Sequence, residues 1–203
     1  MKILFTTPHF NEWCHIAFAY SLVKTRWPKG SSVNVVSCVG SSCAKANRMF
    51  VEMALKDNYD YVILTANDAG WKPDDICKLI DDNKDVVSGW SGVHYPPFHV
   101  KVFTEMDREN VLLKLKGSIG TGLEKVYSAS SEITAYKVDV FRKIKPPWFS
   151  GILNKRGEVV ADDFSFACRA YDAGVEIWVD WDVPIRHHAG GLLSYKGELV
   201  PQI

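Results

Sequence analysis

The sequence lacks the features that mark membrane-spanning, secreted and nucleic-acid-binding chains. No apolar run approaches the roughly 18 residues that a transmembrane helix needs. The first apolar run is ended by polar residues between Thr6 and Asn11, which is too early for a signal peptide. The 24 Lys and Arg residues balance the 24 Asp and Glu residues, so the broad cationic field that binds nucleic acid non-specifically is missing. We therefore expect a cytoplasmic protein with no nucleic-acid partner and no membrane span.

The cysteines are few and scattered. They form no CxxC pair and no zinc-type spacing, and an odd number does not suit a disulfide framework. Reduced, packed thiols are the simplest interpretation, and they agree with an intracellular protein. The five residues are Cys14, Cys38, Cys43, Cys77 and Cys168.

Repeats, low-complexity tracts and Ser-, Gly- or Pro-rich linkers are also absent, so no domain boundary is visible within the 203 residues. A chain of this length suits one domain. In the first half, strand patterns alternate with helix patterns, which favours a parallel sheet with helices on both faces. We predict strands over 2–6, 32–38, 61–65 and 85–88, and helices over 13–23, around 49–54 and over 73–80.

The second half has a different character. Strand-like runs joined by polar turns predict an antiparallel lobe beside the parallel sheet. Short helices then return near 138–144 and 164–172. The expected strands cover 100–104, 111–115, 126–127 and 133–136.

Ligands of such sheets bind in the crevice beyond the carboxyl ends of the strands, so the loops there are the first candidates for a site. The first strand is followed by Thr6, Thr7 and Pro8, which could frame a base or a ribose or form an ordinary turn. The second is followed by Ser41 and a helix carrying Lys45 and Arg48. Free N–H groups at a helix start with basic residues nearby suit an anion, although a plain helix cap fits equally well. The Walker and GxGxxG phosphate motifs are absent.

Acidic residues and histidines follow three later elements. Asp68 comes just after the third strand, where a carboxylate could bind a divalent cation that bridges two phosphates or serve as a turn residue. His187 and His188 follow a strand-like segment and could complete the metal shell, or bind nothing. Asp162 and Asp163 open a helix. Neighbouring helical side chains diverge by about 100°, so we expect one acid to face a cleft and the other to cap the helix.

Taken in order, these segments resemble the GT-A glycosyltransferases, in particular the small family-2-like enzymes carried by phages and large viruses. The resemblance covers nearly the whole chain. It implies a GT-A fold, a mixed and mostly parallel sheet flanked by helices with a small antiparallel lobe. It also implies a single domain, 1–203, with a nucleotide-binding half of about 1–90 and an acceptor half of about 91–203. The end of segment 64–68 corresponds to the family's metal-binding DxD. The other matching segments are 73–80, 86–97, 138–141, 147–149, 162–174 and 187–188.

The sequence departs from the family pattern at four places. Ala66 replaces the first acid of DxD, so only Asp68 remains of the pair. The Arg-Asn pair of the second helix becomes Ala46-Asn47, and the acidic pair is Asp-Asp where Glu-Asp is usual. The small glycine-containing motif before Ile133 becomes Ser130-Ser131-Glu132.

By resemblance, the protein moves a sugar from a nucleotide-diphosphate sugar, with a UDP-sugar favoured, to a glycan or other hydroxyl acceptor with inversion. Mn²⁺ or Mg²⁺ is the implied cofactor, held by Asp68 with His188 or His187. Asp163 is the implied base, and Asp162 is expected mainly to cap the helix or position the acceptor. The implied nucleotide contacts are Thr6, Thr7, Pro8, Ser41, Lys45, Arg48 and Asn67, and the aromatic platforms for sugars are Trp90, Tyr95 and Trp148.

Two alternatives remain open at this point. A catalytically silent module that binds a nucleotide sugar or a glycan fits the loss of the first DxD acid at Ala66. A sugar-phosphate nucleotidyltransferase needs a Gly-rich, basic loop after the first strand, and residues 6–11 contain no Gly, Lys or Arg. The resemblance also leaves room for further domains of a larger polypeptide, and for the host cytoplasm as location if a virus encodes the protein.

Overall fold

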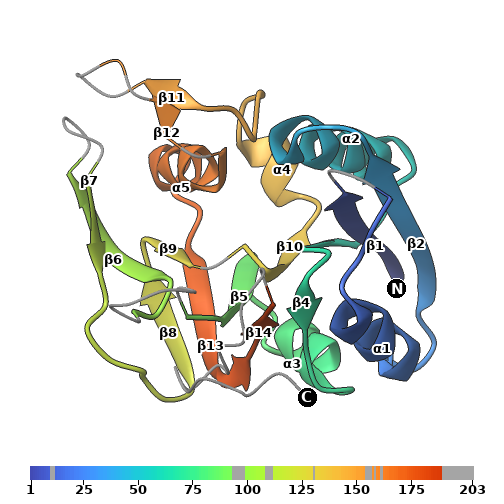
Figure 1. Cartoon of the computed structure of the whole chain (residues 1–203). Helices are drawn as coiled ribbons and strands as arrows, with labels where there is room; N and C mark the ends of the chain where they lie inside the picture. Colours follow the sequence, from blue (N-terminus) through green and yellow to red (C-terminus); the bar gives the residue numbers. More distant parts are fainter. Residues whose placement is uncertain are drawn as a thin grey trace.

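The computed structural model describes residues 1–9, 12–92, 99–107, 112–129, 131–153, 157, 159–160 and 162–188, and only the backbone of 112, 152, 153, 159, 160 and 162. Its centre is a seven-stranded sheet with the order β2-β1-β3-β10-β5-β13-β8 (Figure 1). The strands are β1 (Lys2–His9), β2 (Ser32–Val39), β3 (Tyr61–Thr65), β5 (Val86–Trp90), β8 (Leu123–Val126), β10 (Ile133–Lys137) and β13 (Ile177–Pro184).

The sheet is mixed but mostly parallel. Strands β2, β1 and β3 run parallel to one another, and β13 runs parallel to β5. Strand β10 lies antiparallel between β3 and β5, and β8 is antiparallel to β13 at the edge. The mixed fold class is therefore confirmed. The alternation of the first half by itself indicated only the parallel strands, because β10 enters the middle of the sheet from the second half of the chain.

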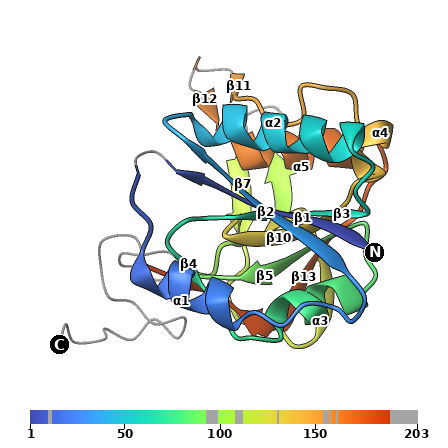
Figure 2. The same cartoon turned by 90° about the vertical axis from the view of Figure 1, so that its right-hand side faces the viewer.

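Helices cover both faces of the sheet. Figure 2 shows α2 (Cys43–Lys56), α4 (Val140–Lys143) and α5 (Asp162–Asp172) on one face, and α1 (Ile16–Lys24) and α3 (Asp75–Asp81) on the other. Each face has its own buried apolar cluster, because side chains alternate along a strand. In β1, Leu4 packs in the cluster that holds Phe50 of α2, whereas Ile3 and Phe5 pack in the cluster that holds Phe18 of α1.

The small antiparallel lobe is also present. It is a three-stranded sheet of β7 (Leu112–Leu115), β6 (Val102–Asp107) and β9 (Ser128–Ala129), at the opposite end of the molecule from β2 (Figure 1). Two short pairs complete the described elements. They are β11 (Ile152–Leu153) with β12 (Val159–Val160), and β4 (Ala69–Gly70) with β14 (Arg186–His187).

The helix starts differ from the predicted ones for a local reason. The helix expected from residue 13 begins at Ile16, because the Nδ1 atom of His15 caps it by accepting a hydrogen bond from the backbone N–H of Ala17 at 3.1 Å. The helix expected from Pro73 begins at Asp75, whose carboxylate accepts the N–H of Lys72 at 2.8 Å.

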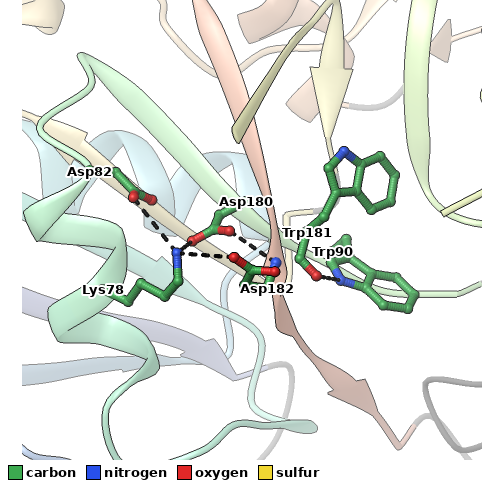
Figure 3. Close-up of polar contacts among 6 residues, drawn as sticks. All are labelled: Lys78, Asp82, Trp90, Asp180, Trp181 and Asp182. Atoms are coloured by element: carbon green, nitrogen blue, oxygen red, sulfur yellow. Dashed lines mark hydrogen bonds and ion pairs between the residues drawn. The ribbon is translucent and has the colours of Figure 1, made fainter. Parts of the chain in front are cut away.

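A partly buried ionic cluster lies between α3 and an irregular part of β13, where the register with β5 shifts between Val179 and Pro184 (Figure 3). The carboxylate of Asp180 is fully buried and pairs with the ammonium of Lys78. Asp82 and Asp182 lie 3.9 and 3.7 Å from the same nitrogen. This cluster is separate from the loops that the sequence indicated as the site.

No helix among the described residues is long and apolar enough to cross a membrane.

Candidate active site

A cavity of about 340 Å³ opens at the carboxyl ends of β1 and β3. The start of α2 and the first turn of α5 complete its wall, so segments from both halves of the chain meet there. Four of the predicted site residues line it, namely Pro8, Asn67, Asp68 and Asp163. The remaining lining residues are Cys43, Asn47, Leu64, Thr65, Ala66, Ser131, Tyr136 and Phe149.

Asp163 occupies the first turn of α5, and its Oδ1 accepts the N–H of Phe164 at 2.9 Å. Its side chain is half-buried and lines the cavity. A carboxylate on the wall of the same cavity as Asp68 is well placed to take a proton from a bound hydroxyl group. Asp162 also belongs to α5, but its side chain lies outside the described residues, so the predicted division of roles between the two acids stays a prediction.

Residues 6–8, expected after the end of the first strand, belong to β1 and contribute less to the cavity than the sequence indicated. Thr6 is fully buried and its hydroxyl donates to the carbonyl of Ile63 at 3.0 Å, so it ties β1 to β3. Thr7 is 2% exposed, and neither threonine is among the described residues that line the cavity. Both expected nucleotide contacts are therefore corrected, because side chains of a central strand face the helices that cover the sheet rather than its end. Of these three residues, Pro8 lines the cavity.

The start of α2 reaches the cavity through residues other than the predicted ones. Ser42 caps the helix, accepting the N–H of Lys45 at 3.4 Å. Cys43 and Asn47 line the cavity, whereas Ser41, Lys45 and Arg48 are not among its described lining residues. A spacing of four residues puts Cys43 and Asn47 on one face of the helix, and that spacing was the signal available in the sequence.

Asp68 is connected to three residues that come from distant parts of the chain. Its Oδ1 lies 3.1 Å from Nε2 of His187. The Nδ1 atom of His187 lies 2.9 Å from Oε1 of Glu132, and the ammonium of Lys101 lies 2.5 Å from the same oxygen. Sequence reasoning missed Glu132 and Lys101 as site residues. Glu132 stood out only as a departure from a family motif.

The electrostatics of this group favour ionised carboxylates. Burial alone raises the pKa of Glu132, but the hydrogen bond from His187 and the charge of Lys101 outweigh it and hold the pKa well below its usual range. Burial also raises the pKa of Asp68, but the hydrogen bond and the charge of His187 outweigh it and lower the pKa of this carboxyl. Burial lowers the pKa of His187, yet the bonds to Asp68 and Glu132 prevail and raise it to about 9. In the absence of a bound cation, His187 is therefore an imidazolium between two carboxylates.

His188 points to the other side of the β4–β14 pair. Its ring stacks on that of His15, with centroids 4.4 Å apart and planes 9° from parallel. Burial lowers the pKa of its imidazole, and its contact with Asp68 is a backbone bond, from its N–H to the carbonyl oxygen at 2.9 Å. His188 directly follows β14, and consecutive residues of an extended backbone face opposite sides. The structure thus brings His187, and not His188, to the Asp68 carboxylate.

Two of the three expected aromatic platforms, Trp90 and Trp148, are buried and not exposed for stacking. Trp90 is 4% exposed and its Nε1 donates to the carbonyl of Trp181 at 2.8 Å (Figure 3). Trp148 is 7% exposed and its Nε1 donates to the carbonyl of Ile144 at 2.8 Å. Both rings belong to the hydrophobic core, which corrects their assignment as sugar contacts. Tyr95 lies outside the described residues.

The described residues contain no group of three or more His, Cys, Asp or Glu side chains that could hold a metal ion. Asp68 and His187 supply two donors, a carboxylate oxygen and an imidazole nitrogen, of the types that bind Mn²⁺ or Mg²⁺. Their separation of 3.1 Å suits two adjacent ligands of one ion. The pair therefore fits a divalent cation whose remaining ligands come from phosphate oxygens and water.

Solved structures share this architecture. The crystal structure of A197 from the virus STIV has a TM-score of 0.69 and 19% identity, and the match covers 100% of this chain and 95% of that one. S. aureus TarS 1–349 in complex with UDP-GlcNAc has a TM-score of 0.52 and 17% identity, over 90% of this chain and 56% of that one. A second structure of S. aureus TarS 1–349 has a TM-score of 0.51 and 18% identity, and the match covers 90% of this chain and 58% of that one.

These similarities establish the fold. It is the GT-A fold, as the sequence resemblance implied. The chain spans little more than half of the TarS chains that it matches. No protein-family model and no curated protein sequence matches it.

Proposed function

We propose that the protein is a glycosyltransferase that moves a sugar from a nucleotide-diphosphate sugar, most simply a UDP-sugar, to a hydroxyl group of a glycan or another acceptor. The observation that carries the proposal is the meeting of Asp68 and Asp163 in one cavity at the carboxyl ends of β1 and β3. The GT-A fold supports it, and so does the complex of TarS with UDP-GlcNAc.

The donor is proposed to bind between the ends of β1 and β3 and the start of α2. Pro8, Asn47 and Asn67 line that side of the cavity. Ser41 lies just before α2, and Lys45 and Arg48 lie within it near Asn47. The two basic residues are proposed to contribute positive charge at longer range, and Ser41 a polar contact to the donor. The nucleotide-binding half then corresponds to about 1–90 and the acceptor half to about 91–203.

Asp68 and His187 are proposed to hold Mn²⁺ or Mg²⁺ on the donor diphosphate. A divalent cation there would offset the negative charge that the leaving nucleotide gains. The chain itself keeps the carboxylate of Asp68 ionised, since the pKa of this group is lowered by its contact with His187.

Asp163 is proposed as the general base. As the acceptor oxygen attacks the anomeric carbon, its proton passes to the carboxylate of Asp163, and the bond from that carbon to the diphosphate oxygen breaks. Attack on the face opposite the leaving group inverts the anomeric centre. Asp162 is proposed to cap α5 or position the acceptor, as the helical divergence of adjacent side chains predicts.

The proposal is tested by incubating the full chain with a panel of nucleotide sugars and Mn²⁺ and measuring nucleotide release, with and without candidate glycan acceptors. Release of UDP from one donor that is abolished in Asp163→Asn supports the proposal. Asp172→Asn is the matched control, because it changes an exposed acid at the other end of α5. No release from any donor by a chain that binds none of them would contradict it.

A binding module without catalysis is the second candidate. The cavity wall has Ala66 where the family carries an acid, and this loss of a carboxylate favours weak or absent turnover. The two candidates separate in calorimetry. A silent module binds a nucleotide sugar or a glycan and leaves it intact, whereas the transferase consumes its donor.

A further inference from the structure

The side chain of Glu132 is buried at the entrance of β10 and connects two parts of the candidate site. It is 4% exposed, and its Oε1 atom faces both Nδ1 of His187 and the ammonium of Lys101. The backbone carbonyl of Glu132 accepts the N–H of Ala66 at 3.0 Å. One residue thus contacts the loop that carries Asp68 through its backbone and His187 through its carboxylate.

The direction of the histidine hydrogen bond follows from the charges. An ionised carboxylate only accepts hydrogen bonds, so Nδ1 of His187 must carry a proton toward Glu132. A neutral imidazole has one N–H, and its lone pair is then on Nε2, the atom that faces Asp68. Nε2 in this form is the nitrogen that can bind a cation beside the Asp68 carboxylate.

Lys101 stabilises the buried carboxylate of Glu132 when His187 is neutral. When His187 is neutral, Glu132 needs another positive group nearby, because an unpaired buried carboxylate is strongly disfavoured. The ammonium of Lys101 lies 2.5 Å from Oε1 of Glu132 and 3.3 Å from Nδ1 of His187. It has no lone pair with which to accept the histidine proton, so the bond from Nδ1 goes to the carboxylate.

We infer that Glu132, paired with Lys101, is a positioning residue that orients the His187 ring and directs its Nε2 atom to a divalent cation shared with Asp68. This inference rests on the proposed function. Carboxylates that accept the second N–H of a metal-binding histidine raise its basicity and fix its orientation. With Ala66 in place of an acid, the described residues supply two protein ligands, Asp68 and His187, and the affinity of the site depends more heavily on His187.

The test measures Mn²⁺ binding to the full chain in the presence of UDP, using the electron paramagnetic resonance signal of free Mn²⁺. Glu132→Gln is expected to weaken Mn²⁺ binding about 10–100-fold, the range typical of lost partners of metal-bound histidines. Glu124→Gln is the matched control, because it removes the charge of another lysine-paired glutamate, 2.6 Å from Lys116, and should leave binding within twofold. Chemical shifts of ¹⁵N-labelled histidine report whether His187 keeps its proton on Nδ1.

A second variant guards against a general loss of structure. Lys101→Met combined with Glu132→Gln removes both charges, so no buried ammonium remains unpaired. It should melt cooperatively and still show the weakened Mn²⁺ binding. Binding within twofold of the unaltered chain in either folded variant would overturn the inference. If the unaltered chain binds UDP but no Mn²⁺, the inference is overturned while donor binding stands. If it binds neither, the proposed function falls as well.

Discussion

The Nε2 atom of His187 lies 3.1 Å from Oδ1 of Asp68, although the two residues come from opposite halves of the chain. The contact exists because β14 pairs antiparallel with β4, with His187 opposite Ala69, directly after Asp68. This pairing places the imidazole of His187 beside the carboxylate of Asp68, the pair proposed above to hold a divalent cation. The predictions below begin from that pair.

Asp68→Ala should abolish the enhancement of UDP binding by Mn²⁺, because the ion loses its only carboxylate ligand from the third strand loop. We expect at least a tenfold rise of the Kd for UDP in the presence of Mn²⁺ and little change in its absence. Titration calorimetry checks both values. Asp74→Ala, which removes an exposed partner of Arg26, is the control. Unchanged metal-dependent binding in Asp68→Ala would remove Asp68 from the site.

Ala66→Asp should preserve or tighten metal-dependent UDP binding, because it restores an acid to the wall of the cavity next to Asp68. The same calorimetric titration with UDP and Mn²⁺ measures the effect. Weaker binding in a folded variant would show that this loop has lost the geometry of a two-acid metal motif.

His187→Ala and His188→Ala should behave differently although they are neighbours. The first removes the nitrogen that faces Asp68, so Mn²⁺ binding in the presence of UDP should fall by about tenfold or more. The second removes a ring that stacks on His15, so it should change the melting temperature more than the metal affinity. Titration of Mn²⁺ followed by electron paramagnetic resonance measures the metal affinity of both variants, and thermal melting measures their stability. The reverse result would mean that the strand β14 presents the other histidine to the ion.

Asp163→Asn should lower the rate of sugar transfer by about 10²–10⁴-fold and leave the donor Kd nearly unchanged, because asparagine keeps the size of the side chain but cannot accept the proton. Asp162→Asn should cost much less, since asparagine also caps helices well. Transfer rates and donor Kd values are measured for both. If Asp163→Asn transfers sugar at a near-native rate and Asp162→Asn is inactive, the general base is Asp162. If both variants are active, the inverting mechanism is contradicted.

Asp82→Asn should stabilise the protein at neutral pH. Burial and the nearby charge of Asp180 raise the pKa of Asp82 from 3.8 to about 6. The folded state therefore binds this proton more tightly than the unfolded state, and its stabilising contribution is lost as the pH rises through about 6. Asparagine does not ionise, so the free energy of unfolding should exceed that of the unaltered chain at pH 8 by at most about 3 kcal/mol, with a smaller difference at pH 4.

Urea denaturation at the two pH values measures this difference. Asp182→Asn is the control, because its side chain is 62% exposed and lies 3.7 Å from the same lysine. An exposed pair of this kind contributes about 0–1 kcal/mol. An Asp82→Asn variant that is less stable than the unaltered chain at pH 8 would show that the Asp82 carboxylate is favourably paired there.

Much of the fold and part of the site follow from local patterns. The run from Tyr61 to Thr65 is apolar or β-branched throughout, and it forms β3 with the predicted bounds. The acids at the start of α5 and Gly174 after its end mark that helix as well. Asp68 was predicted as a site residue because it follows the third strand, and the ends of strands in an α/β sheet converge on one crevice. Asp163 was predicted from the family resemblance, and both residues line the same cavity.

The sequence by itself determined the apolar strands of the first half, the presence of the main helices and which segments carry acids and histidines, since these depend on neighbours within a few residues. Only the tertiary structure decided that β10 enters the sheet antiparallel, that Trp90 and Trp148 are in the core, and that His187 rather than His188 faces Asp68. It also brought Glu132 and Lys101 to His187. These outcomes depend on strand pairing and on contacts between residues far apart in the chain, and local periodicity carries no information about which distant segments will pair.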